Sequence, residues 1–154
     1  KEEGADLVVG GVDVYRDETR INSRPWTPCD DFVARQLGEG DGSHYSAFLF
    51  RRALIEDVPH RPDYELRDDR LFLLEVALKS PDIAEYKPPV LCHRHHDRGR
   101  LQAFHDMKNV VRNHQHLALY TRILGALHDR GALTMRRRQA AAGPANRPQA
   151  NPST

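Results

Sequence analysis

The feature that most constrains the fold is a nearly continuous apolar run that follows two adjacent carboxylates. Residues 66–79 (LRDDRLFLLEVALK) carry Asp68 and Asp69, and almost every later position is apolar. A surface helix confines its apolar residues to one stripe, so this pattern predicts a helix that is mostly buried. The Ser80-Pro81 pair predicts where the helix ends, because proline cannot continue a helix interior.

The carboxylate pair at the head of this helix has two interpretations. Close like charges and partial burial make one member of such a pair a good proton acceptor, so Asp68 and Asp69 are candidates for a general base. Alternatively, both side chains only place negative charge in the first turn of the helix, where it meets the positive end of the helix dipole.

Length and charge exclude several classes of protein. The 154 residues suit one domain with a single core. The 23 Lys and Arg residues nearly balance the 22 Asp and Glu residues, so no overall positive field indicates a nucleic-acid partner. Two cysteines, Cys29 and Cys92, cannot form a disulfide framework, which fits a reduced cytosolic setting. No stretch approaches the ~20 apolar residues of a membrane-spanning helix.

The order of elements along the first half indicates an α/β protein. Val-rich residues 6–15 predict a strand in which Gly10 and Gly11 mark a bend or a close backbone approach. Residues 16–42 predict a long surface excursion around a short amphipathic piece at 31–37. Further expected elements are a short buried strand at 46–50, a helix beginning at 51–56, and strands at 83–86 and 90–93 around Pro88-Pro89 at an edge or bend.

The C-terminal third is expected to be helical and then disordered. Past Gly99, apolar residues recur at helical spacing up to Leu127, which predicts one long helix or two shorter ones ending at Gly131. We therefore expect residues 101–135 to form a helical extension. Residues 136–154 begin with three arginines and continue with Ala, Pro, Asn and Gln, so they predict a disordered basic tail.

The order of these pieces resembles the C-terminal, acceptor-side half of family 2 glycosyltransferases of the GT-A fold, over roughly residues 5–130. It implies part of a Rossmann-like domain, with a mixed sheet, flanking helices and residues 1–100 as the acceptor-side part. The matching segments, in chain order, are GADLVVGGVDVY (4–15), SAFLFRRALIEDV (46–58), RDDRLFLLEVAL (67–78) and AEYKPPVLCHRHH (84–96).

The resemblance assigns roles to individual residues. In that family an Asp that follows Glu or Asp at the head of the helix is the catalytic base, which matches Asp69, with Asp68 in place of the usual Glu. A sugar hydroxyl that attacks an anomeric carbon must lose its proton, and a carboxylate can accept it. The family's aromatic-Arg-x-His pattern places its Arg on Arg94, which can offset phosphate charge, and its metal- or diphosphate-binding His on His96. His93 replaces the aromatic residue, which departs from the pattern.

Two further side chains are candidates for substrate binding. Trp26 can stack on a sugar face, although a lone loop tryptophan can equally fill the core. His44 ends a Gly-rich segment, residues 40–44, that resembles a flexible acceptor loop. For the residues of the His-rich segment, the alternative is a solvated basic loop without a ligand.

The implied reaction is inverting transfer from a nucleotide-sugar donor to a glycan or lipid-linked acceptor. A Mg or Mn ion would be held mainly by an N-terminal nucleotide-binding half. Asp6, Asp13 and Asp17 do not form the Asp-x-Asp motif of that half, so we expect the chain to be part of a longer transferase. A cytoplasmic location is expected, and peripheral association with a membrane stays open because many relatives build envelope polysaccharides.

Two other function classes stay open. The first is a small His-rich metal-binding module that uses His93, His95, His96 and Asp97. The second is a helical interaction module in which residues 101–130 present an exposed apolar stripe to a partner or a membrane surface. The transferase hypothesis requires a mixed sheet, whereas the interaction module requires mostly helix.

Overall fold

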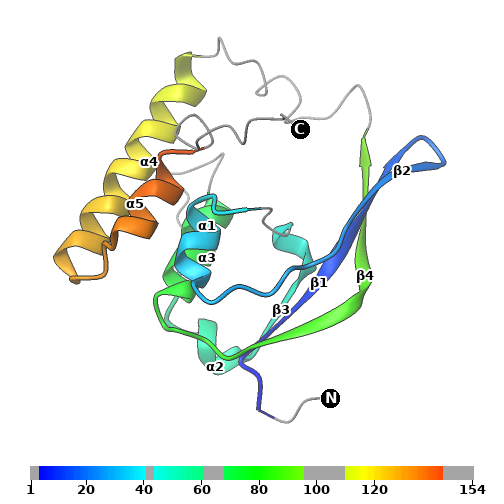
Figure 1. The fold of residues 1–154 in the computed structure, drawn as a ribbon, viewed down its shortest axis with the longest axis horizontal. Coiled ribbons are helices and arrows are strands. Elements are labelled where there is room, and N and C mark those ends of the chain that lie inside the picture. Colours follow the sequence, from blue (N-terminus) through cyan, green and yellow to red (C-terminus); the bar gives the residue numbers. More distant parts are fainter. Residues whose placement is uncertain (1–3, 41–43, 61–67, 96–109, 144–154) are drawn as a thin grey trace, which may run out of the picture.

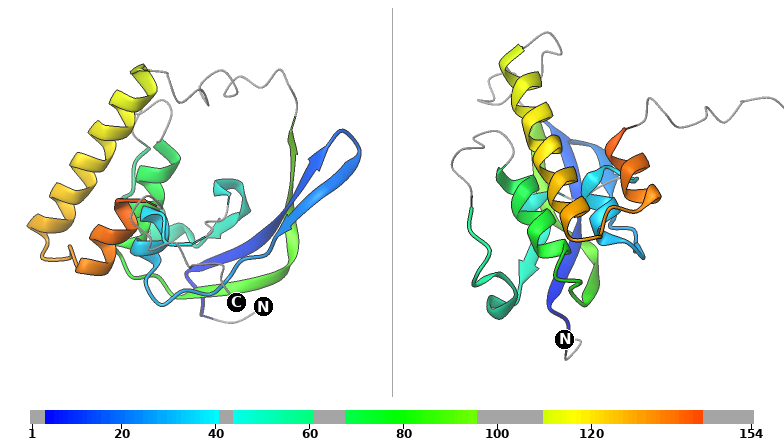
Figure 2. Two further views of the ribbon diagram at one scale, coloured as in Figure 1. Left: turned by 45° about the horizontal axis from the view of Figure 1, so that its top comes forward. Right: turned by 90° about the vertical axis from the view of Figure 1, so that its left-hand side faces the viewer.

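A computed structural model describes residues 4–40, 44–60, 68–95 and 110–143 of the chain. A four-stranded mixed sheet lies against a layer of helices (Figures 1 and 2), which confirms the expected α/β architecture with flanking helices. The strands are β1 (Leu7–Arg16), β2 (Thr19–Arg24), β3 (Phe48–Phe50) and β4 (Ile83–His95). The helices are α1 (Phe32–Leu37), the 3-10 helix η1 (Tyr45–Ala47), α2 (Arg52–Ile55), α3 (Asp68–Ala77), α4 (Val110–Asp129) and α5 (Met135–Ala141).

β1 is the central strand, as its valine-rich sequence favours. β2 pairs antiparallel with its second half and β3 pairs antiparallel with its first half. β4 pairs parallel with β1 along its whole length. The sheet is therefore built around one strand, and residues from distant parts of the sequence meet at its two ends.

The double proline of β4 lies where the β1–β4 pairing is irregular. The register passes from Gly10 opposite Tyr86 to Gly11 opposite Pro89, so residues of β4 are left unpaired at this point. A Cβ at Gly10 would come within 2.6 Å of the Val90 methyl groups, and only glycine fits there. The expected close backbone approach occurs at Gly11, where a Cβ would lie 3.1 Å from the Arg24 carbonyl oxygen. The irregularity expected at the prolines is also present, although β4 runs on as one strand where two were expected.

α3 forms the middle of the core, as the apolar run predicts. Six of its residues are buried: Leu71, Phe72, Leu73, Leu74, Val76 and Ala77. They belong to one cluster with Leu7 and Val9 of β1 and with apolar residues of α1 and α4. Glu75 stays nearer the surface, where its carboxylate pairs with Arg130 at 3.4 Å.

The described residues 16–40 are only in part the surface excursion that their composition suggested: residues 16–25 are exposed, but they form a hairpin, and α1 is buried. β2 folds back on β1 as a hairpin, and the buried carboxylate of Asp13 fixes it by accepting hydrogen bonds from Ser23 Oγ at 2.6 Å and Arg20 Nη1 at 3.3 Å. These bonds, Ser23 foremost, hold the pKa of Asp13 below its usual value despite burial. Polar hairpin residues gave no apolar alternation, which is why the strand was missed.

α1 lies in the interior, and all six of its residues are buried. The side chain of Asp31 caps its first turn by accepting from Ala34 N at 2.9 Å, and Gly38 ends it in a left-handed conformation with φ of 116°. The helix is too short for a clear apolar period, so the sequence could not distinguish a surface piece from a core helix.

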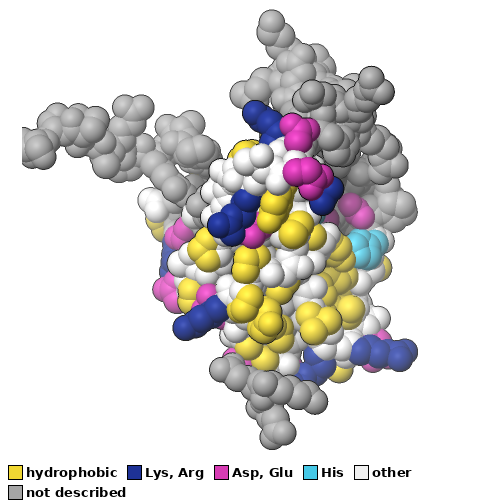
Figure 3. Space-filling model, turned by 90° about the vertical axis from the view of Figure 1, so that its right-hand side faces the viewer, with side chains coloured by type: hydrophobic (Ala, Val, Ile, Leu, Met, Phe, Trp, Pro, Cys, Tyr) yellow, Lys and Arg dark blue, Asp and Glu magenta, His cyan; other side chains and the backbone are white. Residues whose placement is uncertain are grey.

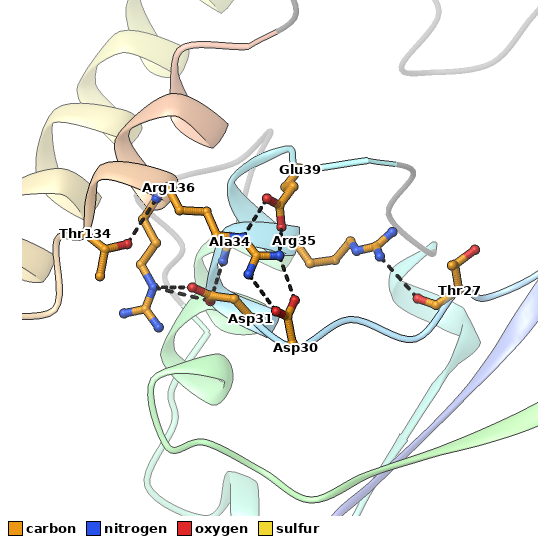
Figure 4. Close-up of polar contacts among 9 residues, drawn as sticks. Thr27, Asp30, Asp31, Ala34, Arg35, Glu39, Thr134 and Arg136 are labelled. Carbon is orange, nitrogen blue, oxygen red and sulfur yellow. Dashed lines mark hydrogen bonds and ion pairs between the residues drawn. The ribbon is translucent and has the colours of Figure 1, made fainter. Parts of the chain in front are cut away.

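α5 corrects the expectation that residues 136–154 are disordered as a whole. Met135–Ala141 form a helix whose arginines bind the acidic residues around α1 (Figure 4). Arg136 holds Asp30 at 2.7 and 2.9 Å and Glu39 at 2.7 and 2.8 Å. Arg137 holds Asp31 at 2.9 Å and donates to the Ala132 carbonyl at 2.8 Å. Residues 144–154 lie outside the described residues.

α4 ends where the sequence predicts, because Gly131 adopts φ of 63° and Ala132 N donates back to the Leu127 carbonyl at 2.8 Å. Its apolar residues Leu119, Ile123 and Leu127 are buried in the common core. In the described part of the chain, no helix has both the length and the apolar character needed to cross a bilayer.

The face of the sheet that points away from the helices carries exposed apolar side chains. Leu49 is 71% exposed, Tyr86 52% and Val90 48%. Val8 lies opposite both Leu49 and Ala84 in the sheet. Figure 3 shows apolar side chains gathered over the middle of this side of the molecule.

Candidate functional site

The two carboxylates at the start of α3 have different surroundings. Asp68 is half-buried, and its Oδ2 lies 3.2 Å from His60 Nδ1. Asp69 is exposed, and its Oδ1 accepts a hydrogen bond from the backbone N–H of Arg70 at 2.7 Å. The Arg70 guanidinium donates instead to the Gln36 carbonyl at the end of α1. Among the described residues, the Asp69 carboxylate has no cationic or imidazole partner, whereas Asp68 is hydrogen-bonded to His60.

His60 connects Asp68 to a third side chain. Its Nε2 lies 3.1 Å from the hydroxyl of Tyr45, which begins η1. The imidazole also stacks on the buried ring of Phe72, with centroids 4.6 Å apart and planes within 5°. Tyr45, His60 and Asp68 thus form a continuous polar chain that joins η1, the segment after α2 and the first turn of α3.

Tyr45 lies in an aromatic environment beside the carboxylates. Its ring contacts Phe50 at 6.4 Å and Phe72 at 5.8 Å between centroids. Burial raises the pKa of the Tyr45 phenol, and the negative charges of Asp68 and Asp69 raise it further. The phenol therefore stays protonated at neutral pH and serves as a hydrogen-bonding group.

The end of β4 reaches this region through a pair of histidines. The rings of His44 and His93 lie 5.2 Å apart in an edge contact, and His44 directly precedes Tyr45. His44 Nδ1 accepts from Ser46 N at 3.2 Å, so its neutral ring carries the proton on Nε2. The structure therefore brings together the His44 segment and the His-rich segment, which are far apart in the sequence.

Two other predicted substrate-binding residues have structural partners. Trp26 is 5% exposed and packs against Phe32 and Phe48 at 6.2 and 6.1 Å, so it fills the core, the second of its two interpretations. Arg94 is exposed and lies 3.4 Å from the Glu18 carboxylate at the tip of the β1–β2 hairpin. A weak exposed pair of this kind can exchange for another anion.

The predicted metal ligand His96 lies outside the described residues, as does Asp97. Among the side chains that are described, no group of three or more His, Cys, Asp or Glu is arranged to hold a metal ion.

Sequence reasoning named Asp68, Asp69 and His44 but missed His60 and Tyr45. Neither missed residue belongs to a local motif: His60 follows Pro59 in a polar loop, and Tyr45 follows a Gly-rich segment. Only the tertiary fold places them beside α3, so no local signal could have identified them. Comparisons of the chain with family models, curated proteins and solved structures gave no match.

Proposed function

We propose that this chain is the acceptor side of an inverting glycosyltransferase, in which Asp69 is the general base. The observation that carries the proposal is the difference between the two adjacent carboxylates. Asp68 is held by His60, while Asp69 is exposed and free of ion pairs among the described residues. A carboxylate that is fixed on a rigid helix and open to solvent can reach an incoming hydroxyl.

The proposed reaction is a single displacement between a nucleotide sugar and a glycan or lipid-linked acceptor. The acceptor oxygen forms a bond to the anomeric carbon while the bond from that carbon to the diphosphate oxygen breaks. The hydroxyl proton passes to the Asp69 carboxylate, and the bonding electrons leave with the nucleoside diphosphate. Attack opposite the leaving group inverts the anomeric configuration.

The surroundings of Asp69 support an acceptor site. The partly buried rings of Tyr45 and Phe50 lie next to the carboxylates, and aromatic rings suit the apolar faces of sugars. His44 and His93 add polar groups from a neighbouring segment. The mixed sheet with flanking helices meets the architectural requirement of the proposal, and we extend it to the sheet being part of a GT-A domain.

The other function classes receive less support. The interaction module required an exposed apolar stripe on the C-terminal helix, but Leu119, Ile123 and Leu127 of α4 are buried in the core. The metal-binding module uses His93, His95, His96 and Asp97, of which His96 and Asp97 lie outside the described residues.

The experiment is a transferase assay on the protein in which this chain occurs. Release of nucleoside diphosphate from UDP-, GDP- and dTDP-linked sugars is followed with a panel of saccharide acceptors. Asp69→Asn is expected to lower the transfer rate by about 10²–10⁴-fold, the usual contribution of a general base. Asp82→Asn, an exposed carboxylate that precedes β4, is the matched control and should leave the rate unchanged. A folded protein that transfers no sugar, or a fully active Asp69→Asn, would contradict the proposal.

A further inference from the structure

Three side chains from separate segments form one hydrogen-bonded chain at the candidate site. Tyr45 Oη lies 3.1 Å from His60 Nε2, and His60 Nδ1 lies 3.2 Å from Asp68 Oδ2. The last member of this series of hydrogen bonds is the carboxylate of Asp68, which precedes the proposed base Asp69 in the sequence. The His60 imidazole and the Tyr45 hydroxyl have no role in the reaction as proposed above.

The carboxylate fixes the direction of the first bond, and it fixes that of the second when the imidazole is neutral. A carboxylate can only accept, so His60 Nδ1 carries the proton that is donated to Asp68. A neutral imidazole then has its lone pair on Nε2, and the Tyr45 hydroxyl donates to it. Asp68 and Tyr45 thereby select one tautomer of His60, and each group in the chain has a partner.

Packing fixes the plane of the imidazole as the hydrogen bonds fix its rotation. The ring lies flat on Phe72, which is 4% exposed and belongs to the core. Tyr45 also packs edge-on against both Phe72 and His60. The imidazole is therefore anchored to the buried face of α3, although half of its surface meets solvent.

We propose that His60 and Tyr45 are positioning residues that hold Asp68 in place, so that Asp69 alone receives the acceptor proton. The inference rests on the proposed function. Asp68 and Asp69 are adjacent, and a mobile, unpaired Asp68 would compete for the acceptor hydroxyl and repel the charge on Asp69. Binding Asp68 to an anchored imidazole limits that competition, because His60 engages Oδ2 of the Asp68 carboxylate.

A kinetic comparison tests this role. His60→Ala is expected to lower kcat about 10-fold with little change in KM, because the base is misplaced while the acceptor still binds. His60→Asn, whose amide can donate near the position of Nδ1, should restore most of kcat. Tyr45→Phe keeps the ring packing and should cause a smaller loss. His128→Ala is the matched control, since His128 contacts Asp129 at 3.5 Å on the exposed side of α4.

A nitrogen NMR spectrum of the histidine rings tests the same hydrogen bonds without any assay of activity. We expect the neutral form of His60 to carry its proton on Nδ1 and not on Nε2, and Asp68→Ala to abolish this preference. The opposite tautomer would contradict the hydrogen bonds from Tyr45 to His60 and from His60 to Asp68, even if Asp69→Asn is inactive. The expected tautomer with an unchanged kcat in His60→Ala would overturn the positioning role alone. A fully active Asp69→Asn would refute the proposed function and leave the tautomer result standing.

Discussion

The chain contains two Asp-Asp pairs at the beginnings of helices, and the fold uses them in opposite ways. Asp30 and Asp31 precede α1, and each is bound by an arginine of α5. Asp68 and Asp69 begin α3, where, among the described residues, Asp68 bonds to the single imidazole of His60 and Asp69 has no such partner. The first Asp-Asp pair therefore joins α1 to α5, whereas the second leaves the Asp69 carboxylate exposed to solvent.

The charges around the first pair explain its structural role. Hydrogen bonds from Arg136 lower the pKa of Asp30 to about 2. For Asp31, burial favours the neutral form, but hydrogen bonds from Arg137 and from Ala34 N outweigh it and lower the pKa of that carboxyl. The carboxylates of Asp30 and Asp31 are ionised and accept several hydrogen bonds, which suits a structural contact between two helices. A general base needs the opposite condition, namely room for an incoming proton donor.

The largest expected effect separates the two carboxylates of the second pair. Asp69→Asn should reduce the transfer rate by about 10²–10⁴-fold because the proton acceptor is lost. Asp68→Asn should reduce it much less, because the amide oxygen can still accept from His60. Steady-state rates of nucleoside diphosphate release measure both. Equal losses of transfer rate in the two variants would mean that the two carboxylates act together, and would contradict the separate roles given to them.

The next effect concerns the junction between α1 and α5. Arg137→Ala leaves the largely buried Asp31 without its cation, so we expect the free energy of unfolding to fall by about 2 kcal/mol. Urea denaturation followed by circular dichroism measures it. Arg138→Ala, on the exposed side of the same helix, is the control and should change stability by less than about 0.5 kcal/mol. Equal stabilities of the two variants would show that α5 is not held by this ion pair.

A smaller effect divides the two roles of Asp31, which pairs with Arg137 and caps α1. Asp31→Asn keeps an oxygen for the Ala34 N–H but loses the charge, whereas Asp31→Ala loses both. We expect Asp31→Ala to be less stable than Asp31→Asn by about 1 kcal/mol, the usual value of an N-cap. The same denaturation experiment gives the difference. Identical stabilities would assign the whole effect to the ion pair.

The smallest effect is the acid dependence of the junction. A carboxyl whose pKa is lower in the folded state contributes stability above its unfolded pKa, and this contribution is lost as the pH falls through the folded pKa. Asp30 should therefore lose its contribution between its ordinary value of 3.8 and about 2. In urea titrations across this range, Asp30→Asn should lose less stability than the native protein. Parallel pH profiles would show that the Arg136 pair adds nothing measurable.

Much of the fold could be predicted where one segment carries its own pattern. The valine-rich β1, the apolar α3 and the Gly131 end of α4 each depend on local sequence, and the structure confirms all three. The short amphipathic piece expected at 31–37 corresponds to α1, but its burial and the helix α5 could not be predicted, because each depends on contacts with the other. The sequence of α5 alone predicts an arginine-rich tail, because the fold supplies its partners Asp30, Asp31 and Glu39 from a distant segment.

The candidate site divides in the same way. Asp68 and Asp69 were visible because their chemistry and the helix that follows them are contiguous in the sequence. His60 and Tyr45 were not visible, because they are 15 positions apart in the sequence and only the fold brings them into contact. Trp26 was ambiguous because a single aromatic side chain in a loop can face either way, and only the packing of Phe32 and Phe48 around it shows that it belongs to the core.

The most direct test of the account compares one exposed carboxylate from each pair. The transfer rate of Asp69→Asn is measured beside that of Asp30→Asn, with circular dichroism spectra to verify that both variants fold. The account predicts a loss of about 10²–10⁴-fold for Asp69→Asn and an unchanged rate for Asp30→Asn. An Asp69→Asn protein that transfers sugar at the native rate would contradict the central claim that Asp69 is the general base.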